Sequence, residues 1–569
     1  MYHIKFVREK LDFQAPSGMT VLEAERKAGI VPDAPCGGQG KCGKCRVRID
    51  GQEVLACRTQ IDRDMEVDTL EENFGYEILT EGLQRSVRFQ PDLRQQRVVI
   101  EKPETGDNRS DWERLLCQLP VKDSIKPDLM IASSLYACRK QAADWYVIYT
   151  ENEILQISQE QKKMCFVAFD IGTTTVAGYL MDAETGRVLA VKSHMNPQTQ
   201  YGADVIMRAN YTLEHTVEPL RDSIQKELDK MLCELAEEAG IQKTDIYQVS
   251  VVGNTCMHHL FLGISPASLV HAPYNPAIRQ SLVLRAAEYG LHIHPKAQLL
   301  LLPDIAGYVG ADTCGCILSL RQDLQEKISL MIDIGTNGEM VLGNKDRLAC
   351  CSTAAGPAFE GAKIECGMRG ASGAVDHVEY KDGTWSYTTV GNAVPVGLCG
   401  SGLIDLVAQL RKAELIDESG HLESGQEVPG KFVLVPPEKT ADGKGVYLTQ
   451  KDIGEVQLAK AAIAAGIQLL MKQLAITEED IQAVYIAGAF GNYMNPRSAA
   501  MIGMIPASLL EKITPVGNAA GEGAKIALLN KTERQEMDQM TRHMEFVELA
   551  VSTEFQDCFV DELCFPELA

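Results

Sequence analysis

The stretch that decides the fold is a strand–turn–strand sequence near the middle of the chain, Phe166-Val167-Ala168-Phe169-Asp170-Ile171-Gly172-Thr173-Thr174-Thr175-Val176-Ala177-Gly178-Tyr179-Leu180. An apolar run of β-forming residues ends at Asp170, and a second run follows the threonines. Gly172 has no Cβ and lets an anion approach the backbone, while Asp170 offers a carboxylate to a hydrated divalent ion. The stretch predicts a phosphate-binding hairpin, although it lacks the lysine of a helix-opening phosphate loop.

The same pattern returns in the second half of the chain. Residues 329–342 again place an apolar strand before Asp333-Ile334-Gly335-Thr336 and a second strand after it. A third apolar strand, residues 483–487, leads into Gly488-Ala489-Phe490-Gly491. Chance is the alternative explanation, because turns of this composition are common in ordinary hairpins. In this order the three segments resemble the acetate kinase/sugar kinase/heat-shock-70/actin superfamily over residues 164–550.

This resemblance implies an ATP site between two halves of similar fold. Asp170 and Asp333 would position Mg²⁺ and water, and Glu339 is a candidate to orient the attacking water. The residues expected to hold phosphate are Gly172, Thr173, Thr174, Thr175, Gly335, Thr336, Asn337 and Gly338. Those expected around the adenosine are Gly488, Ala489, Phe490, Gly491 and Lys460.

The first eighty residues contain four cysteines with the spacing of a cluster site. Cys36, Cys42, Cys45 and Cys57 are separated by five, two and eleven residues. Glycines between the first three let the loop curl and aim N–H groups at the sulfurs, which favours a [2Fe–2S] cluster. A Cys₄ zinc site is the alternative, because one pair has the two-residue gap of zinc-binding arms. The gap of five resembles that of the adrenodoxin-like ferredoxins, and the gap of eleven is shorter than theirs.

Length and composition bound the class of protein. The chain has 569 residues, and 55 Lys and Arg against 78 Asp and Glu give a net charge of −23, which argues against nucleic-acid binding. We see no apolar leader and no run of transmembrane length, so no membrane partner is expected. Seventeen cysteines, several isolated in apolar segments, indicate a reducing compartment, and the cytoplasm is the expected location.

The predicted fold class is α+β and α/β multidomain. We expect a β-grasp ferredoxin domain at residues 1–80, a linker at 81–109 and a small middle domain at 110–163. Residues 164–569 are expected to form a duplicated actin-like ATPase domain of two subdomains.

A ferredoxin domain joined to such an ATPase resembles the reductive activators of corrinoid enzymes over nearly the whole chain. The motifs that carry this resemblance are Asn196-Pro197-Gln198, Gly253-Asn254-Thr255, Asp333 to Glu339, Cys399-Gly400-Ser401-Gly402 and Gly488 to Gly491. It implies ATP-dependent reduction of Co(II) to Co(I) in a corrinoid methyl-transfer protein, with the electron passing from the [2Fe–2S] cluster and replenished by an upstream donor. Ser401 is a candidate for contact with either nucleotide or corrinoid, and a homodimer is one option for assembly.

Two other functions share part of this pattern. A small-molecule kinase would use the same hairpins but has no use for a ferredoxin domain. An ATP-driven low-potential electron carrier for another enzyme would use both parts. For corrinoid reduction, ATP must favour a conformation or complex in which the cobalt is easier to reduce. The reason is that the reduction potential of the Co(II)/Co(I) couple lies below that of an ordinary [2Fe–2S] centre.

Overall fold

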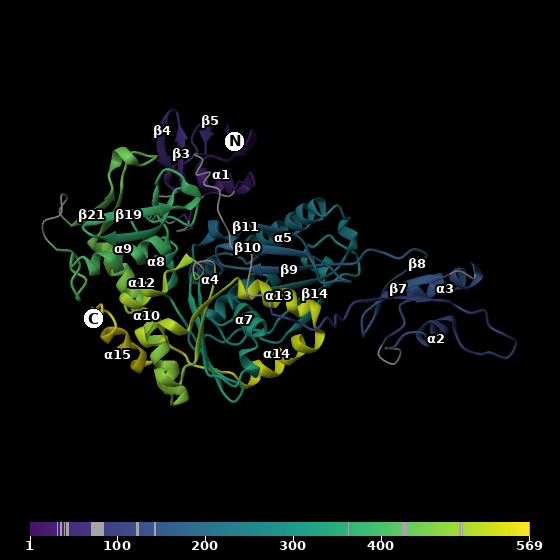
Figure 1. The fold of residues 1–569 in the computed structure, drawn as a ribbon. Helices are drawn as coiled ribbons and strands as arrows, with labels where there is room; N and C mark the ends of the chain where they lie inside the picture. Colours follow the sequence, from purple (N-terminus) through teal and green to yellow (C-terminus); the bar gives the residue numbers. More distant parts are fainter. Residues whose placement is uncertain are drawn as a thin grey trace.

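Two six-stranded sheets form the two lobes of the main body, with smaller N-terminal and middle domains attached (Figure 1). The computed structural model describes the chain apart from residues 31, 33, 35–36, 39, 41–44, 70–84, 121–124, 142–143, 362, 424–429, 489–490, 492 and 568–569.

The first sheet has the order β11-β10-β9-β12-β14-β13. Its strands are β9 (Cys165–Ile171), β10 (Thr175–Asp182), β11 (Val188–Met195), β12 (Ile246–Gly253), β13 (Leu282–Arg285) and β14 (Gln298–Leu301). The first three form an antiparallel meander, and β12 and β14 continue the sheet in parallel with β9. Both faces of β9 are covered, which explains its nearly continuous apolar sequence.

The second sheet, in the order β24-β23-β15-β16-β17-β25, repeats five strands of this topology, and its sixth strand lies at the opposite edge. Its strands are β15 (Ser329–Ile334), β16 (Gly338–Gly343), β17 (Leu348–Thr353), β23 (Ala483–Ala487), β24 (Ile513–Gly517) and β25 (Glu545–Phe546). Again a meander of three strands is followed by two parallel strands. The predicted duplication is confirmed, and each predicted hairpin lies at the same place in its sheet.

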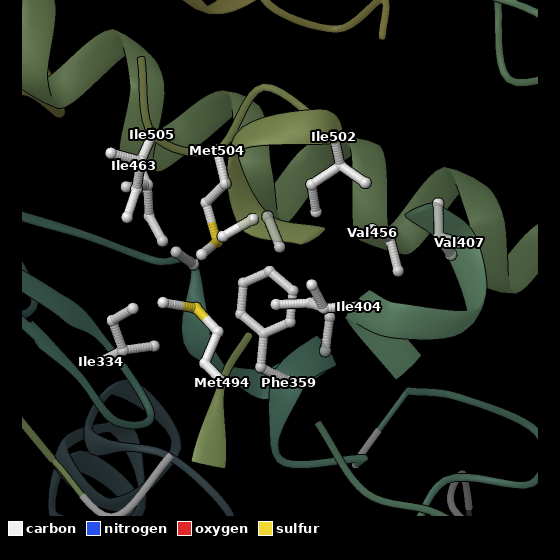
Figure 2. Close-up of a cluster of buried hydrophobic side chains, with 14 of the residues drawn as sticks. Ile334, Phe359, Ile404, Val407, Val456, Ile463, Met494, Ile502, Met504 and Ile505 are labelled. Atoms are coloured by element: carbon white, nitrogen blue, oxygen red, sulfur yellow. The ribbon is translucent and has the colours of Figure 1, made fainter. Parts of the chain in front are cut away.

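Helices cover the outer face of each sheet. Helix α5 (Glu218–Glu238) packs on the first sheet and α10 (Gln450–Leu474) on the second, and α9 (Gly400–Lys412) belongs to the same hydrophobic core as α10. Figure 2 shows part of this second core, where Phe359 lies among aliphatic side chains from α9, α10 and the segment after α12 (Pro496–Met501). Helix α10 is long and apolar enough to cross a membrane, contrary to the sequence expectation, but 72% of its apolar window is buried inside the protein. It is a core helix of the second lobe.

Two further helices lie between the sheets and join the lobes. Helices α7 (Ala311–Leu320) and α13 (Ala519–Leu529) contribute to one shared core with residues of both sheets. They cross at Gly315 and Gly523, where a Cβ on Gly523 would lie only 2.0 Å from the carbonyl oxygen of Gly315. The two backbones therefore touch, and only glycine fits at this crossing.

An insertion between β17 and β23 adds two small sheets to the second lobe. They consist of β18 (Ala374–Lys381), β19 (Thr384–Thr389) and β20 (Gly397–Leu398), and of β21 (Lys431–Val435) and β22 (Val446–Thr449). The described part of the main body also contains α4 (Val205–Glu214), α6 (Thr255–Leu262), α8 (Gly356–Phe359), α14 (Lys531–His543) and α15 (Thr553–Asp561).

The N-terminal domain has the predicted β-grasp arrangement. Its sheet, in the order β2-β1-β5-β3-β4, consists of β1 (Tyr2–Phe6), β2 (Leu11–Ala15), β3 (Arg46–Ile49), β4 (Gln52–Leu55) and β5 (Met65–Asp68). Helix α1 (Val21–Lys27) begins after Thr20, whose hydroxyl accepts from the N–H of Glu23 while the Glu23 carboxylate accepts from the Thr20 N–H. In this capping box each of the two residues satisfies a backbone donor of the other at the start of the helix.

The middle domain projects from the main body (Figure 1). It comprises β6 (Arg94–Val98), β7 (Trp145–Tyr149), β8 (Ile154–Ser158), α2 (Asp111–Leu116) and α3 (Leu129–Gln141). Strand β6 pairs with β7, so this sheet extends into the range 81–109 expected as a linker. Glu153 holds the domain on the first lobe by accepting from Arg285 at 2.8 Å and from Gln298 at 2.6 Å.

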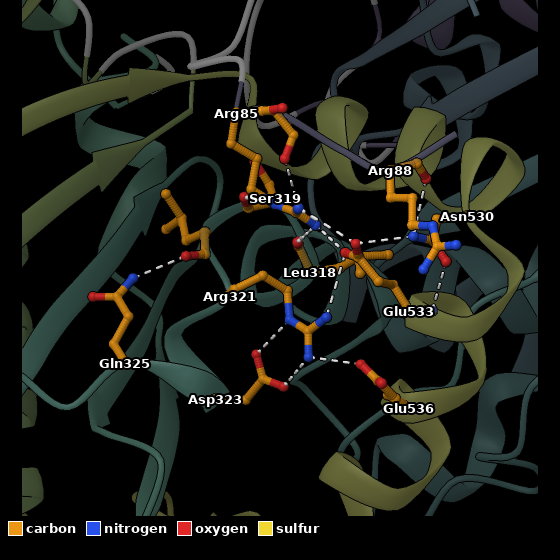
Figure 3. A network of polar contacts seen from close by, with 12 residues as sticks. Arg85, Arg88, Leu318, Ser319, Arg321, Asp323, Gln325, Asn530, Glu533 and Glu536 are labelled. Carbon is orange, nitrogen blue, oxygen red and sulfur yellow. Dashed lines mark hydrogen bonds and ion pairs between the residues drawn. The ribbon is translucent and has the colours of Figure 1, made fainter. Parts of the chain in front are cut away.

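The segment that follows the N-terminal domain is fixed to the main body by ion pairs (Figure 3). Arg85 donates to the carbonyls of Leu318 and Ser319 at the end of α7 and pairs with Glu533 of α14. Asn530, just after α13, donates to the carbonyl of Arg88 at 3.1 Å. Thus the chain is anchored where α7 and α13 both end.

Candidate functional site

A cavity of about 530 Å³ lies between the two predicted hairpins. Its volume is in the range of ordinary small-molecule sites. The predicted residues that line it are Asp170, Gly172, Thr173, Thr174, Thr175, Asp333, Gly335, Thr336, Asn337, Glu339 and Gly488. Ser401 also lines it, at the start of α9. The duplicated fold therefore brings two segments about 160 residues apart in sequence to opposite sides of one cavity.

Three half-buried aspartates, Asp170, Asp312 and Asp333, line this cavity. Burial raises the pKa of Asp170 to about 7 and that of Asp333 to about 6, and the charge of Asp333 adds to the cost of ionising Asp170. Asp312, in the first turn of α7, also has its pKa raised to about 7, by burial and then by Asp333. Such a site holds full charge at neutral pH when a cation is present, and hard carboxylate oxygens suit Mg²⁺.

Glu339 is more deeply enclosed than these aspartates. Its carboxylate accepts from the Ser352 hydroxyl at 3.2 Å, and burial, followed by repulsion from Asp312 and Asp333, raises its pKa well above the ordinary value. Glu339 lines the same cavity as Asp170 and Asp333, and its expected role in orienting the attacking water stays a prediction.

Glu360 connects the two hairpins, a contact that the sequence analysis did not foresee. Its carboxylate accepts from the hydroxyl of Thr174 at 3.1 Å and from that of Thr336 at 2.9 Å. Of the described residues that line the cavity, six are acidic and only Arg369 is basic. A polyphosphate would consequently need metal ions to bind here.

The first hairpin is supported from behind by amide and guanidinium groups. Asn196 donates to the carbonyl of Gly172 at 2.8 Å, and Asn254 donates to the Thr173 hydroxyl at 3.1 Å. Arg208, fully buried, donates to the carbonyls of Thr173 and Gly202. Burial lowers its pKa to about 10, so it stays charged at neutral pH.

Asn518 supports the same hairpin from the other lobe. Its side chain donates to Asp170 at 2.9 Å and to the Tyr179 hydroxyl at 3.1 Å. Asn518 precedes α13 and Asp312 lies in the first turn of α7, so these two polar residues occupy related positions in the duplicated fold. In the sequence, both residues could be found by comparing the start of α7 with the start of α13.

Not every predicted residue lies at the cavity. Lys460, expected beside adenosine, is fully buried elsewhere and donates to the carbonyl of Cys564. Gly338 and Gly491 do not line the cavity, because each packs closely against a neighbouring strand. Ala489 and Phe490 lie outside the described residues.

Gly488 lines the cavity. Its φ is +90°, and a Cβ there would lie 2.7 Å from the carbonyl oxygen of Ile334 and 2.8 Å from Oδ1 of Asp333. The strand-to-glycine turn therefore packs directly against the second hairpin, which requires glycine.

The structure describes two of the four cysteines that are predicted to bind the cluster, Cys45 and Cys57. Cys45 is buried just before β3, and Cys57 lies in the short helical turn 56–58, linked to it by the Ala56 N–H donating to the Cys45 carbonyl at 2.7 Å. Cys36 and Cys42 lie outside the described residues. Among the residues that are described, no group of three or more His, Cys, Asp or Glu could hold a metal ion.

The loop before Cys45 nevertheless fits a cluster. Gly37, Gly38 and Gly40 all have positive φ, as a tightly curled loop requires, and Arg58 donates to the Gly40 carbonyl at 2.7 Å. This links the loop to the turn that carries Cys57. Curled backbone of this kind can aim N–H groups at cluster sulfurs.

Family profiles match successive parts of the chain. They are a 2Fe-2S iron-sulfur cluster binding domain at residues 5–80, the RACo linker region at 82–163, the RACo middle region at 165–325 and the C-terminal ASKHA domain of RACo at 327–569. The predicted ferredoxin and actin-like ATPase folds are therefore confirmed.

Individual relatives agree with these profiles. The corrinoid activation enzyme RamQ of Eubacterium limosum is 33% identical over 594 residues, which cover 98% of each chain. A [Co(II) methylated amine-specific corrinoid protein] reductase of Methanosarcina barkeri is 25% identical, over 70% of this chain and 76% of its own length. A solved reductive activator for corrinoid, iron-sulfur protein superposes with a TM-score of 0.77 and 32% identity, over 100% of this chain and 99% of its own. By these matches the chain belongs to the RACo family of reductive activators of corrinoid proteins.

Proposed function

We propose that this protein uses ATP to drive the transfer of one electron to the Co(II) corrinoid of a methyl-transfer protein, which regenerates Co(I). The observation that carries the proposal is the presence, in one chain, of a ferredoxin domain and a cavity in which two aspartate hairpins face each other. A kinase needs only the second of these features.

The residues around the cavity have distinct proposed roles. Asp170 and Asp333 would hold Mg²⁺, which would neutralise phosphate charge in an otherwise acidic cavity. Backbone N–H groups and hydroxyls of the two hairpins, at 172–175 and 335–337, would bind the phosphates. Gly488, against the second hairpin, would flank the nucleoside together with its neighbours in sequence.

Cys36, Cys42, Cys45 and Cys57 would ligate the [2Fe–2S] cluster, which supplies a one-electron carrier when bound. An upstream donor replaces each electron passed to cobalt. Hydrolysis at the cavity can drive the uphill transfer only through conformations that differ in affinity for the partner or in the position of the N-terminal domain.

We also propose a division of labour along the chain: cluster binding at residues 1–80, connection at 81–109, a spacer or docking role at 110–163 and ATP hydrolysis at 164–569. The cytoplasm is the proposed compartment, because four thiolates must reach the cluster reduced. Nothing in the charge of −23 favours nucleic acid as a partner.

The test is anaerobic. Reduced protein is mixed with a corrinoid protein in the Co(II) state and Mg-ATP, and the cobalt absorbance is followed. Formation of Co(I) is expected to require ATP and to be lost in Cys57→Ser and Asp333→Asn, but not in the controls Cys117→Ser and Asp346→Asn, which alter exposed residues outside both sites. ATP-dependent phosphorylation of a small metabolite without Co(I) would instead support the kinase, and reduction of an enzyme without cobalt would support the other electron carrier.

A further inference from the structure

Described residues of the N-terminal domain contact the first lobe at Gln200 and Tyr201. The guanidinium of Arg26, on α1, donates to the carbonyl of Gln200 and lies 5.2 Å from the centre of the Tyr201 ring. On the same side, a Cβ on Gly37 would lie 2.9 Å from the carbonyl oxygen of Tyr201. The residue next to the predicted ligand Cys36 is therefore in backbone contact with the ATPase domain.

Tyr201 is held in place by other aromatic rings. Its ring lies 5.0 Å from that of Tyr211 on α4, which stacks on His215 at 4.2 Å with an angle of 9° between the planes. Burial lowers the pKa of Arg26, yet its cation is balanced here by a carbonyl and an aromatic face. The contact thus has the character of a specific docking surface.

The segment that forms this surface is tied to the first phosphate hairpin at both ends. It is the helical turn 197–201, which begins after Asn196, and the Asn196 side chain accepts from the Gln198 N–H while donating to the Gly172 carbonyl. The Asn196 N–H also donates to the carbonyl of Thr174 at 2.8 Å. One end of the turn is therefore hydrogen-bonded directly to the hairpin.

Arg208 makes the second connection. It donates to the carbonyl of Thr173 in the hairpin and, at 2.9 Å, to the carbonyl of Gly202 directly after the turn. Among the residues that the structure describes, no carboxylate lies within ion-pair distance of this buried guanidinium. Its other contacts are the Gln198 side-chain oxygen within the turn, at 3.5 Å, and the Met257 sulfur of α6, at 3.2 Å. Because one buried charge is bonded to both the hairpin and the turn, a shift of one segment changes the energy of the other.

We propose that the turn 197–201 is a nucleotide-sensing dock for the [2Fe–2S] domain, with Arg26 and Tyr201 as its positioning residues. This rests on the proposed nucleotide site. Phosphate bound at residues 172–174 orders the hairpin and, through Asn196 and Arg208, the turn. The preorganised Tyr201 surface then binds α1 and the glycine loop more tightly. Nucleotide state thereby controls how firmly the cluster domain is held on the ATPase domain.

Thermodynamic reciprocity gives the first test. If nucleotide strengthens docking, loss of docking must weaken nucleotide binding by the same factor. We expect Arg26→Met and Tyr201→Leu each to raise the Kd for a non-hydrolysable Mg-ATP analogue roughly five- to tenfold, measured calorimetrically. The double variant should be no weaker than either single variant, because both remove one contact. Lys27→Ala, the exposed cation next to Arg26, is the matched control.

Hydrogen–deuterium exchange of the full-length protein gives a second test. With the same analogue we expect slower exchange at the hairpin, at residues 196–202 and at α1. Protection of the hairpin alone, or faster exchange at α1, overturns the dock but leaves the nucleotide site standing. Absence of protection at the hairpin together with absence of binding overturns the proposed function itself. An unchanged Kd in both single variants also overturns the dock.

Discussion

Asn518 donates a hydrogen bond to Asp170 across the boundary between the two lobes, at 2.9 Å. The amide comes from the N-terminus of α13, and the carboxylate comes from the end of β9. Helix α13 packs against both sheets, so a movement of this helix would change the hydrogen bond between Asn518 and the first hairpin. This bond also lowers the pKa of Asp170, which burial otherwise raises.

We expect Asn518→Ala to shift the acid limb of the ATPase pH profile to higher pH. Removal of the donor destabilises the Asp170 carboxylate, so a higher pH is needed to ionise it. The maximal rate should fall roughly tenfold, the scale of one charge-assisted hydrogen bond. Asn344→Ala, at a turn far from the cavity, should leave the profile unchanged, and an unshifted acid limb in Asn518→Ala would contradict the assignment.

The raised pKa of Asp333 predicts that the free energy of unfolding of the metal-free protein falls as pH rises. The folded-state pKa of Asp333, about 6, lies above its ordinary value of 3.8, so the folded protein binds more protons between these values. Its stabilising contribution is present below pH 3.8 and is lost as pH rises through 6. Asp333→Asn should therefore raise the thermal midpoint of the metal-free protein more at pH 8 than at pH 5.

This gain corresponds to roughly 2–3 kcal/mol at pH 8. It should be measured by calorimetry in the presence of a chelator, with exposed Asp346→Asn as the control. Since the same variant is expected to lose ATP hydrolysis, stability and activity would move in opposite directions. An equal gain at both pH values would show that Asp333 is ionised throughout.

Glu360 predicts a gain in nucleotide affinity on neutralisation. Its carboxylate accepts hydrogen bonds from the hydroxyls of Thr174 and Thr336, which are the donors that a phosphate would use. Glu360→Gln removes a negative charge beside the phosphate position, and we expect the Kd for the Mg-ATP analogue to fall several-fold. Glu379→Gln, on an exposed part of β18, is the comparison. Weaker binding in Glu360→Gln would indicate that the carboxylate holds the metal instead.

Lys460 gives a prediction of the opposite kind. Its amine is buried against the C-terminal segment, so Lys460→Met should destabilise the second lobe by about 1–3 kcal/mol by leaving the Cys564 carbonyl without its donor. The affinity for nucleotide should not change. Lys451→Ala, at the exposed start of the same helix, should affect neither quantity, and a large loss of affinity in Lys460→Met would restore the adenosine assignment.

The elements that were predictable from sequence are those whose signal is local. Each hairpin is a continuous run in which strand, aspartate and glycine turn are adjacent, and both hairpins lie where the repeat predicts. The cap of α1 by Thr20 is similarly local. Even the resemblance of the whole chain depended on such short runs.

The remaining features depend on contacts between distant segments. Glu360 contacts Thr174, which is 186 positions away, and Asn518 contacts Asp170, which is 348 positions away. The residues next to Glu360 and Asn518 in the sequence therefore do not indicate these partners. Lys460 does not line the cavity, because the packing of α10 on the second sheet directs this side chain to the C-terminal segment, which the helix sequence does not indicate. Strand β6 was missed because its polar sequence forms a strand only beside β7.

Helices α7 and α13 are in direct backbone contact where they cross, at Gly315 and Gly523. Their N-terminal ends carry Asp312 and lie beside Asn518 at the cavity, whereas their C-terminal ends hold Arg85 and Arg88 of the connecting segment. Because the two backbones touch at Gly315 and Gly523, no flexible side chain separates the helices at this point. Together with their shared core, they form a continuous packed connection from the cavity to the segment that follows the N-terminal domain.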